Sequence, residues 1–165
     1  MASPNISRHD KGFTLLETLV VMGIFIVLMG VGGVIGFNAY KGYLFRSERS
    51  TAVSVLERAR SRAMANYNQK KHGVKYDNVT DPDHPKYIIF EGNSYVEDPS
   101  NEIIEGSPNA STTLDVIVFD QLTGNPNPSA SGPATGCEDD EKSIKVSEGD
   151  KESYVCINNE GRINW

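Results

Sequence analysis

Residues 11–25 read KGFTLLETLVVMGIF, and this stretch decides how the rest of the chain is interpreted. An apolar run begins after the glycine, and no residue from Thr18 to Tyr40 is charged. About twenty apolar residues in a helix span the hydrocarbon core of a bilayer, so the run predicts a membrane helix. It is too long for the apolar region of a signal peptide, and no small-residue cleavage site follows it. We therefore expect the chain to stay anchored.

The charges on either side of this run bear on its orientation. Arg8 and Lys11 precede it and favour a cytoplasmic N-terminus, because positive residues are retained on the cytoplasmic side of a membrane. Lys41 and Arg46 follow the run and weaken this signal. On balance we expect the N-terminus inside the cytoplasm and the remainder of the chain outside it.

The overall composition excludes several classes of protein. The 165 residues carry a formal net charge of −6, which disfavours general binding to nucleic acid, since that requires a basic surface. The two cysteines form no C-x-x-C pair and have no histidine nearby, so a zinc site is not expected. Motifs for a phosphate-binding loop, a nucleophile elbow or a metal-binding helix are lacking, and we expect neither an enzyme nor a cofactor.

Beyond the apolar run, the pattern indicates a second helical segment. Residues 41–69 contain no proline, and Ala52, Leu56, Ala59 and Ala63 recur at helical spacing. We interpret residues 41–70 as the amphipathic continuation of the same helix, with a small-residue face that packs on a partner. A separate amphipathic helix would show the same pattern.

From residue 71 the period changes to that of β-strands. Short β-type runs alternate with turn signals such as Gly92-Asn93 and Gly149-Asp150. The runs are HGVKYD, KYIIFEG, TTLDVIVFDQ, KSIKVSEG, ESYVCIN and GRINW. The fold class predicted is α+β, with a long N-terminal helix packed on a mostly antiparallel C-terminal sheet. Four parts are expected: a leader (1–12), an apolar helix (13–40), its amphipathic half (41–70) and a β-rich domain (71–165).

The N-terminal stretch resembles the start of type IV prepilins and of the pseudopilins of type II secretion. The resemblance rests on Gly12, Phe13, Thr14, Leu15 and Glu17, followed by the apolar run. It implies that a prepilin peptidase cuts between Gly12 and Phe13 and that the new amino group of Phe13 is N-methylated. It also implies a type IV pilin-like fold, in a single-pass membrane protein that is later drawn into a helical filament.

The remainder of the chain is similar to the GspH/FimT group of minor pilins and pseudopilins. In that group a helix with an Ala-Arg-Ser-x-Ala pattern leads into a β-rich domain that ends near a Gly-Arg hairpin. The corresponding residues here are Ala59, Arg60, Ser61, Ala63, Gly161 and Arg162. The acidic, proline-rich segment around residues 125–141 has no counterpart in that pattern, which leaves the particular secretion or pilus system open.

Glu17 lies one helical turn into the apolar run. Near a membrane interface it could simply reach water or be protonated. Within a bundle of helices an unpaired carboxylate costs several kcal/mol, and a cation would offset that cost. The resemblance supplies one, namely the ammonium of processed Phe13 in the same or a neighbouring chain. We therefore interpret Glu17 as an assembly residue.

Cys137 and Cys156 are about twenty residues apart, the first in a predicted loop and the second in a predicted strand. If this part lies outside the cytoplasm, a disulfide is the natural interpretation. Two buried thiols acting as small apolar side chains are the alternative. Asp77, Asp81 and Asp83, and the run EDDE at 138–141, lack the ligand order of a calcium loop, so we expect solvated acidic surface rather than a metal site.

These observations predict a structural minor pilin or pseudopilin that helps to initiate or cap a filament in secretion or surface piliation. The expected partners are other pilins or pseudopilins, the prepilin peptidase and, before assembly, the membrane. One alternative is a DNA-binding minor pilin for DNA uptake, although Arg162 is the single cation of the tail. A membrane-anchored exported enzyme is the other, and an uncut N-terminus would favour it.

Overall fold

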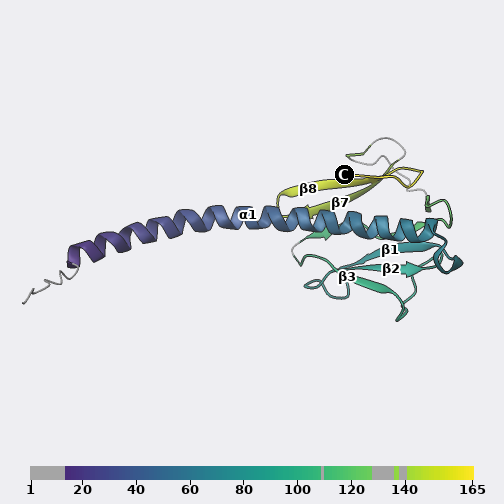
Figure 1. The fold of residues 1–165 in the computed structure, drawn as a ribbon, viewed down its shortest axis with the longest axis horizontal. Coiled ribbons are helices and arrows are strands. Elements are labelled where there is room, and N and C mark those ends of the chain that lie inside the picture. Colours follow the sequence, from purple (N-terminus) through teal and green to yellow (C-terminus); the bar gives the residue numbers. More distant parts are fainter. Residues whose placement is uncertain (1–13, 109, 128–135, 138–140) are drawn as a thin grey trace, which may run out of the picture. The chain divides into compact units, whose positions relative to one another are not determined.

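The computed structural model describes residues 14–108, 110–127, 136–137 and 141–165, with residues 34–38 described as backbone only. The chain divides into two compact units, Met1–Tyr40 and Lys41–Trp165. Helix α1, Leu15–Met64, passes from the first unit into the second, and all described strands belong to the second unit (Figure 1). Each unit is described by itself below.

Helix α1 is shorter at its C-terminal end than the sequence predicts. We expected helix up to residue 70, but α1 ends at Met64 and is followed by a short 3₁₀ helix, η1, at Tyr67–Gln69. Asn66 adopts a left-handed conformation with φ 55°, and asparagine tolerates this conformation better than most residues. The carbonyl of Ala63 accepts from the N–H of Asn66 at 3.1 Å and also from the N–H of Leu122 at 2.9 Å, which ties the helix end to the loop after β5.

The β-domain consists of two sheets, not the single sheet that we expected. The first has the order β3-β2-β1-β5-β6 and the second the order β4-β7-β8-β9. Their strands are β1 His72–Asp77, β2 Lys86–Glu91, β3 Glu102–Glu105, β4 Ser111–Thr112, β5 Val116–Phe119, β6 Pro126–Asn127, β7 Lys142–Glu148, β8 Lys151–Ile157 and β9 Ile163–Asn164. Every pairing between them is antiparallel, which confirms the predicted α+β class.

The core of the second unit lies between the two sheets and the helix segment after Tyr40. In Figure 1, β1–β3 lie on one side of this segment and β7 and β8 on the other. Ala52, Leu56 and Ala59 are at most 1% exposed. They share a single apolar cluster with Val74, Tyr87 and Ile89 of the first sheet and Val146, Val155 and Ile157 of the second. The small-residue face of the helix therefore packs on this chain's own sheets.

Arg60 joins the helix to one loop of each sheet. Its guanidinium donates to the carbonyl of Gly124 between β5 and β6, at 3.4 Å, and to that of Glu160 between β8 and β9, at 3.0 Å. The two loops touch at Gly161, where a Cβ atom would overlap the Gly124 carbonyl. Gly161 also has φ +77°, which favours glycine. The Gly-Arg hairpin is thus a packing junction between the sheets.

Candidate assembly segment

The described N-terminal segment begins with a helix cap. The N–H of Glu17 donates to Oγ1 of Thr14 at 3.3 Å, which places Thr14 at the N-cap and Glu17 at the third helical position. Thr-x-x-Glu is the spacing of a capping box, in which the acidic residue favours the positive end of the helix dipole. The threonine and the carboxylate of the motif therefore have a local role in starting α1.

The segment Leu15–Gly33 has the length and composition to cross a membrane. None of its residues is buried. Leu16 is 74% exposed and Met29 is 73% exposed, whereas an isolated soluble protein rarely leaves so many large apolar side chains in water. The segment is thus complete as a helix and lacks packing partners among the described residues of its own chain.

The residues predicted from the motif are only partly visible. Gly12 and Phe13, the predicted cleavage and methylation residues, lie outside the described residues. Glu17 is described and exposed, within the first turn of α1. The cleavage, methylation and ammonium–carboxylate pair therefore stay predictions.

The structure joins Cys137 and Cys156 in a disulfide, the pairing that the sequence analysis predicted. Cys156 lies on β8 and is 8% exposed, and the Cα–Cα distance is 5.7 Å. Glu141 is close to both sulfur atoms, but sulfur atoms joined in a disulfide are not thiolate ligands. The residues 138–140 of the acidic run lie outside the described residues.

The acidic residues before β2 organise turns. The carboxylate of Asp77 accepts hydrogen bonds from the backbone N–H groups of Val79 and Thr80 and from Oγ1 of Thr80, the last at 2.8 Å. The bond from the Thr80 hydroxyl is the main reason that the pKa of Asp77 lies below its usual value. Asp81 accepts from the N–H of Asp83 at 3.2 Å. These interactions explain the aspartates of this segment as turn-forming groups.

Two buried polar residues of the second unit were not singled out by the sequence analysis. Glu48 is 2% exposed, and it accepts hydrogen bonds from the hydroxyl of Tyr87 and from the N–H of Ser107, each at 2.7 Å. The pKa of Tyr76 is raised to about 12, mainly by burial and secondly by the nearby carboxylate of Glu48. Glu48 lies four residues before Ala52 in the apolar helical stripe, so its register alone could have revealed it.

His72 is the second of these residues. It is 1% exposed, and neither ring nitrogen has a hydrogen-bond partner within the described parts of the chain. Burial lowers its pKa, partly opposed by Glu91, whose Oε1 lies 3.8 Å from Nε2. A buried, unpaired imidazole is expected to stay neutral. Its position in an alternating β-type run gave no sign that it would be enclosed.

Comparison with known proteins identifies the first of the two regions. Residues 7–33 match the family model described as the prokaryotic N-terminal methylation motif. The chain carries a prepilin-type N-terminus. This match confirms the resemblance drawn from Gly12, Phe13 and Glu17, and it covers the end of the predicted leader, the predicted cleavage position and the apolar helix as far as residue 33.

The other two comparisons concern the chain as a whole. No curated protein matches it significantly. Among solved structures, the type IV minor pilin FimU of Pseudomonas aeruginosa is similar, with 15% sequence identity and a TM-score of 0.49. The alignment covers 72% of this chain and 90% of FimU. The description of the β-domain that follows the prepilin-type N-terminus therefore rests on the contacts within this chain.

Proposed function

We propose that this chain is a minor subunit of a type IV pilus or of a type II secretion pseudopilus. The observation that carries the proposal is the prepilin-type N-terminus on a helix whose first part, Leu15–Gly33, is apolar and exposed. Such a segment requires an apolar surrounding, first a bilayer and then the helices of other subunits. The second unit has a core of its own and would form the outer part of the filament.

In this proposal, a prepilin peptidase removes residues 1–12 at the cytoplasmic face, and the amino group of Phe13 is then methylated. The subunit waits as a single-pass membrane protein with the β-domain outside the cytoplasm. The Cys137–Cys156 disulfide supports this location, because disulfides persist in oxidising compartments. The filament is assembled through the N-terminal helices, and this subunit takes part at initiation or at the tip, in secretion or surface piliation.

The two alternative functions lack a specific observation in their favour. DNA binding requires unpaired cations on an exposed surface. Here Arg58 and Arg62 are both paired with Glu102, each at 2.5 Å, and the net charge is −6. For an enzyme, the described residues bring together no nucleophile, base and oxyanion-binding groups in the manner that catalysis needs.

N-terminal mass spectrometry tests the proposed processing. Protein recovered from membranes or from sheared filaments should begin at methylated Phe13. Gly12→Asp should block the cut, because a charged side chain replaces the glycine that the peptidase accepts. A wild-type chain that still begins at Met1 in cells with active peptidase would contradict the proposal.

Glu17 variants test assembly. Glu17→Ala should be inserted and cut but not incorporated into filaments, since a buried ammonium left without its partner costs about 3–5 kcal/mol. Glu17→Gln separates pairing from capping, because glutamine can still complete a capping box but cannot neutralise an ammonium. Glu57→Ala, which removes an exposed carboxylate from the same helix, is the matched control. Normal incorporation of Glu17→Gln would assign Glu17 to capping alone.

A further inference from the structure

Two cations follow the uncharged run Thr18–Tyr40 on the side proposed to lie outside the cytoplasm, where positive residues are disfavoured. They are Lys41 and Arg46, and both are exposed. Assembly through the N-terminal helix gives them no role. Because they directly follow the run in the sequence, the chain itself holds them near the surface of the bilayer.

The geometry of the helix places these cations at the depth of the lipid headgroups. Helix α1 is continuous from Leu15 to Met64, and each residue advances it by about 1.5 Å. The run from Thr18 to Tyr40 is therefore about 34 Å long, enough to cross a hydrocarbon core of about 30 Å. Arg46 follows about 9 Å farther along the helix, and helical side chains point back toward the N-terminus. Its guanidinium can therefore reach the headgroup layer, which is about 5–7 Å deep.

The hairpin of β7 and β8 brings another cation to the same level of the helix. The strands are joined by the turn at residues 149–150, and β8 begins at Lys151. A Cβ atom at Gly42 would lie 3.0 Å from Nζ of Lys151, so the ammonium packs on the helix where glycine leaves room for it. Arg49 donates to Oγ of Ser153 at 3.4 Å and holds the start of β8 on the helix. All these contacts lie within the second unit.

Lys41, Tyr43, Arg46 and Lys151 are exposed and form what we call the basic face. Arg46 and Lys151 form no ion pair with another described residue. Tyr43 is 69% exposed, and tyrosine rings favour the interface between membrane and water. The basic face therefore offers positive charge beside an amphipathic ring, a combination that suits a layer of anionic headgroups.

The carboxylates of the hairpin leave this charge in place. Glu148 stands opposite Lys151, but it is only 9% exposed and forms no ion pair with it. Glu152 is paired with Lys145. Asp150 is the exposed carboxylate of the turn. The cations of the basic face thus outnumber the exposed, unpaired carboxylate beside them.

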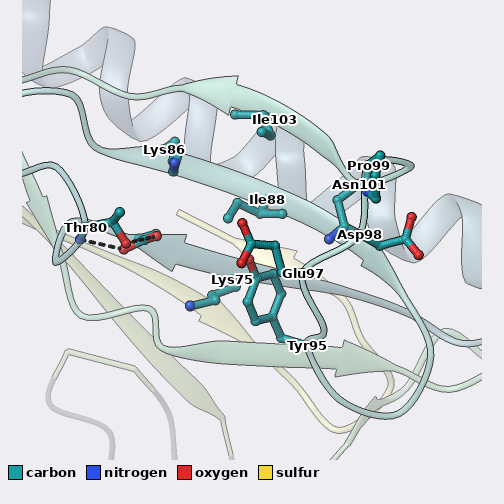
Figure 2. A pocket seen from close by; sticks show the side chains of 11 residues that line it. Lys75, Thr80, Lys86, Ile88, Tyr95, Glu97, Asp98, Pro99, Asn101 and Ile103 are labelled. Carbon is teal, nitrogen blue, oxygen red and sulfur yellow. Dashed lines mark hydrogen bonds between the residues drawn. The ribbon is translucent and has the colours of Figure 1, made fainter.

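The pocket on the outer face of the first sheet has the opposite balance. There Lys75 and Lys86 lie among Asp77, Glu97 and Asp98 (Figure 2). Three carboxylates surround two ammonium groups, so this pocket presents no excess of positive charge. An anionic surface would be attracted to the basic face and not to this pocket.

Acidic groups of the first sheet lie on the other side of the helix from the hairpin. The loop between β1 and β2 carries Asp81 and Asp83. Its end at Pro85 lies beside Gly106 and Glu48, farther along the helix than the level at which the hairpin turn begins. Figure 1 shows β1–β3 and β7–β8 on opposite sides of this part of the helix. The second unit therefore has one side that suits an anionic bilayer and one that does not.

We propose that the basic face binds the anionic phospholipid headgroups of the bilayer in which the subunit waits. The inference rests on the membrane stage of the function proposed above. Arg46 and Lys151 supply the charge, and Tyr43 supplies the ring at the interface. The β-domain is thereby docked on the membrane by the side of its second sheet. Entry into a filament must break these contacts, so the basic face sets how firmly the waiting subunit is held.

The test uses the full chain with ¹⁵N-labelled glycine in nanodiscs that contain a lipid with a nitroxide on its headgroup. Gly149 reports on the hairpin turn, and Gly92 and Gly161 serve as references elsewhere in the unit. With about one third phosphatidylglycerol in phosphatidylcholine, the Gly149 signal should broaden at least about twofold more than in phosphatidylcholine alone. About 0.5 M salt should remove the difference. Equal broadening in both discs would overturn the inference, whereas a chain that enters neither disc would contradict the proposed function as well.

Variants separate the basic face from net charge. Lys151→Gln and Arg46→Gln should each lower the ratio of docked to undocked domain in anionic discs about fivefold, which corresponds to about 1 kcal/mol. Asp150→Asn should raise this ratio. Arg162→Gln, the matched control, removes an exposed cation just before β9, at the opposite end of β8 from Lys151, and should not change it. Equal effects of all three cation variants would overturn the inference.

Unchanged reference signals will show that each variant is folded. A short DNA duplex is the competing anion, and it should leave the Gly149 signal unchanged in neutral discs because the basic face has too few cations to bind a duplex. A saturable shift of Gly149 by the duplex would assign the face to nucleic acid and would also overturn the inference.

Discussion

Leu28 and Leu56 lie on the same continuous helix, yet they are in opposite environments. Leu28 is 62% exposed and Leu56 is fully buried, at 0%. The first belongs to a segment whose apolar side chains have no partners in the described chain, and the second to a core closed by two sheets. The two halves of one helix therefore differ in what can bury them, because only the second half has sheets of its own chain to pack against.

The largest effect on stability is expected from truncating Leu56, with the same change at Leu28 as a comparison. Leu56→Ala should lower the free energy of unfolding of the second unit by about 2–5 kcal/mol, since it leaves a cavity in a closed core. Leu28→Ala, the matched control, should leave it unchanged. Urea unfolding of the full chain in detergent, followed by tyrosine fluorescence, measures both. Equal losses would show that the two halves fold as one unit.

Reduction of the disulfide should destabilise the second unit alone. The Cys137–Cys156 bridge closes a loop with a sequence separation of 19, which is worth about 3 kcal/mol in the loop-entropy model. For a domain of this size we expect the melting temperature to fall on the order of 10 °C. Calorimetry with and without reductant measures the shift. An unchanged melting temperature would mean that the two sheets hold this segment without the bridge.

Arg60 and Arg58 lie on the same half of the helix but differ in what they bind. Arg60→Met keeps the stem of the side chain but removes donors to the carbonyls of Gly124 and Glu160, and it should cost about 1–3 kcal/mol. Arg58→Met removes a side chain that is 52% exposed and paired with Glu102, and it should cost less than about 1 kcal/mol. Chemical unfolding of both variants provides the measurement, and a larger loss for Arg58→Met would show that the bonds from Arg60 to the two loops contribute little to stability.

The smallest effect concerns pH. The pKa of His72 is lowered in the folded state, so the unfolded chain binds a proton more readily. The stability that His72 contributes is therefore fully present above its unfolded pKa of about 6.5 and is lost as the pH falls below it, by at most about 1.4 kcal/mol per pH unit. His72→Leu should remove this part of the pH dependence between pH 7.5 and 5.5. His84→Gln, at a side chain 79% exposed, should not.

Local patterns in the sequence were sufficient for the general architecture. The uncharged run from Thr18 to Tyr40 predicted the exposed apolar helix, and residues 12–17 predicted the prepilin-type N-terminus that the family comparison confirmed. Period-two runs predicted six of the described strands, because alternation is set by the pleat of the backbone itself. β3 and β6 lie outside these runs, and β4 was not distinguished from β5 in the run that begins at Thr112.

Where the helix ends, how the strands divide into two sheets and which polar groups are enclosed all depend on long-range contacts. The end of the helix is joined to the loop after β5 by the hydrogen bond from Leu122 to Ala63, and Tyr95 lies next to Lys75 on the outer face of the first sheet. These contacts join residues more than ten positions apart, so no local period contains them. Local sequence patterns set which side chains each segment must bury, and long-range packing sets what buries them.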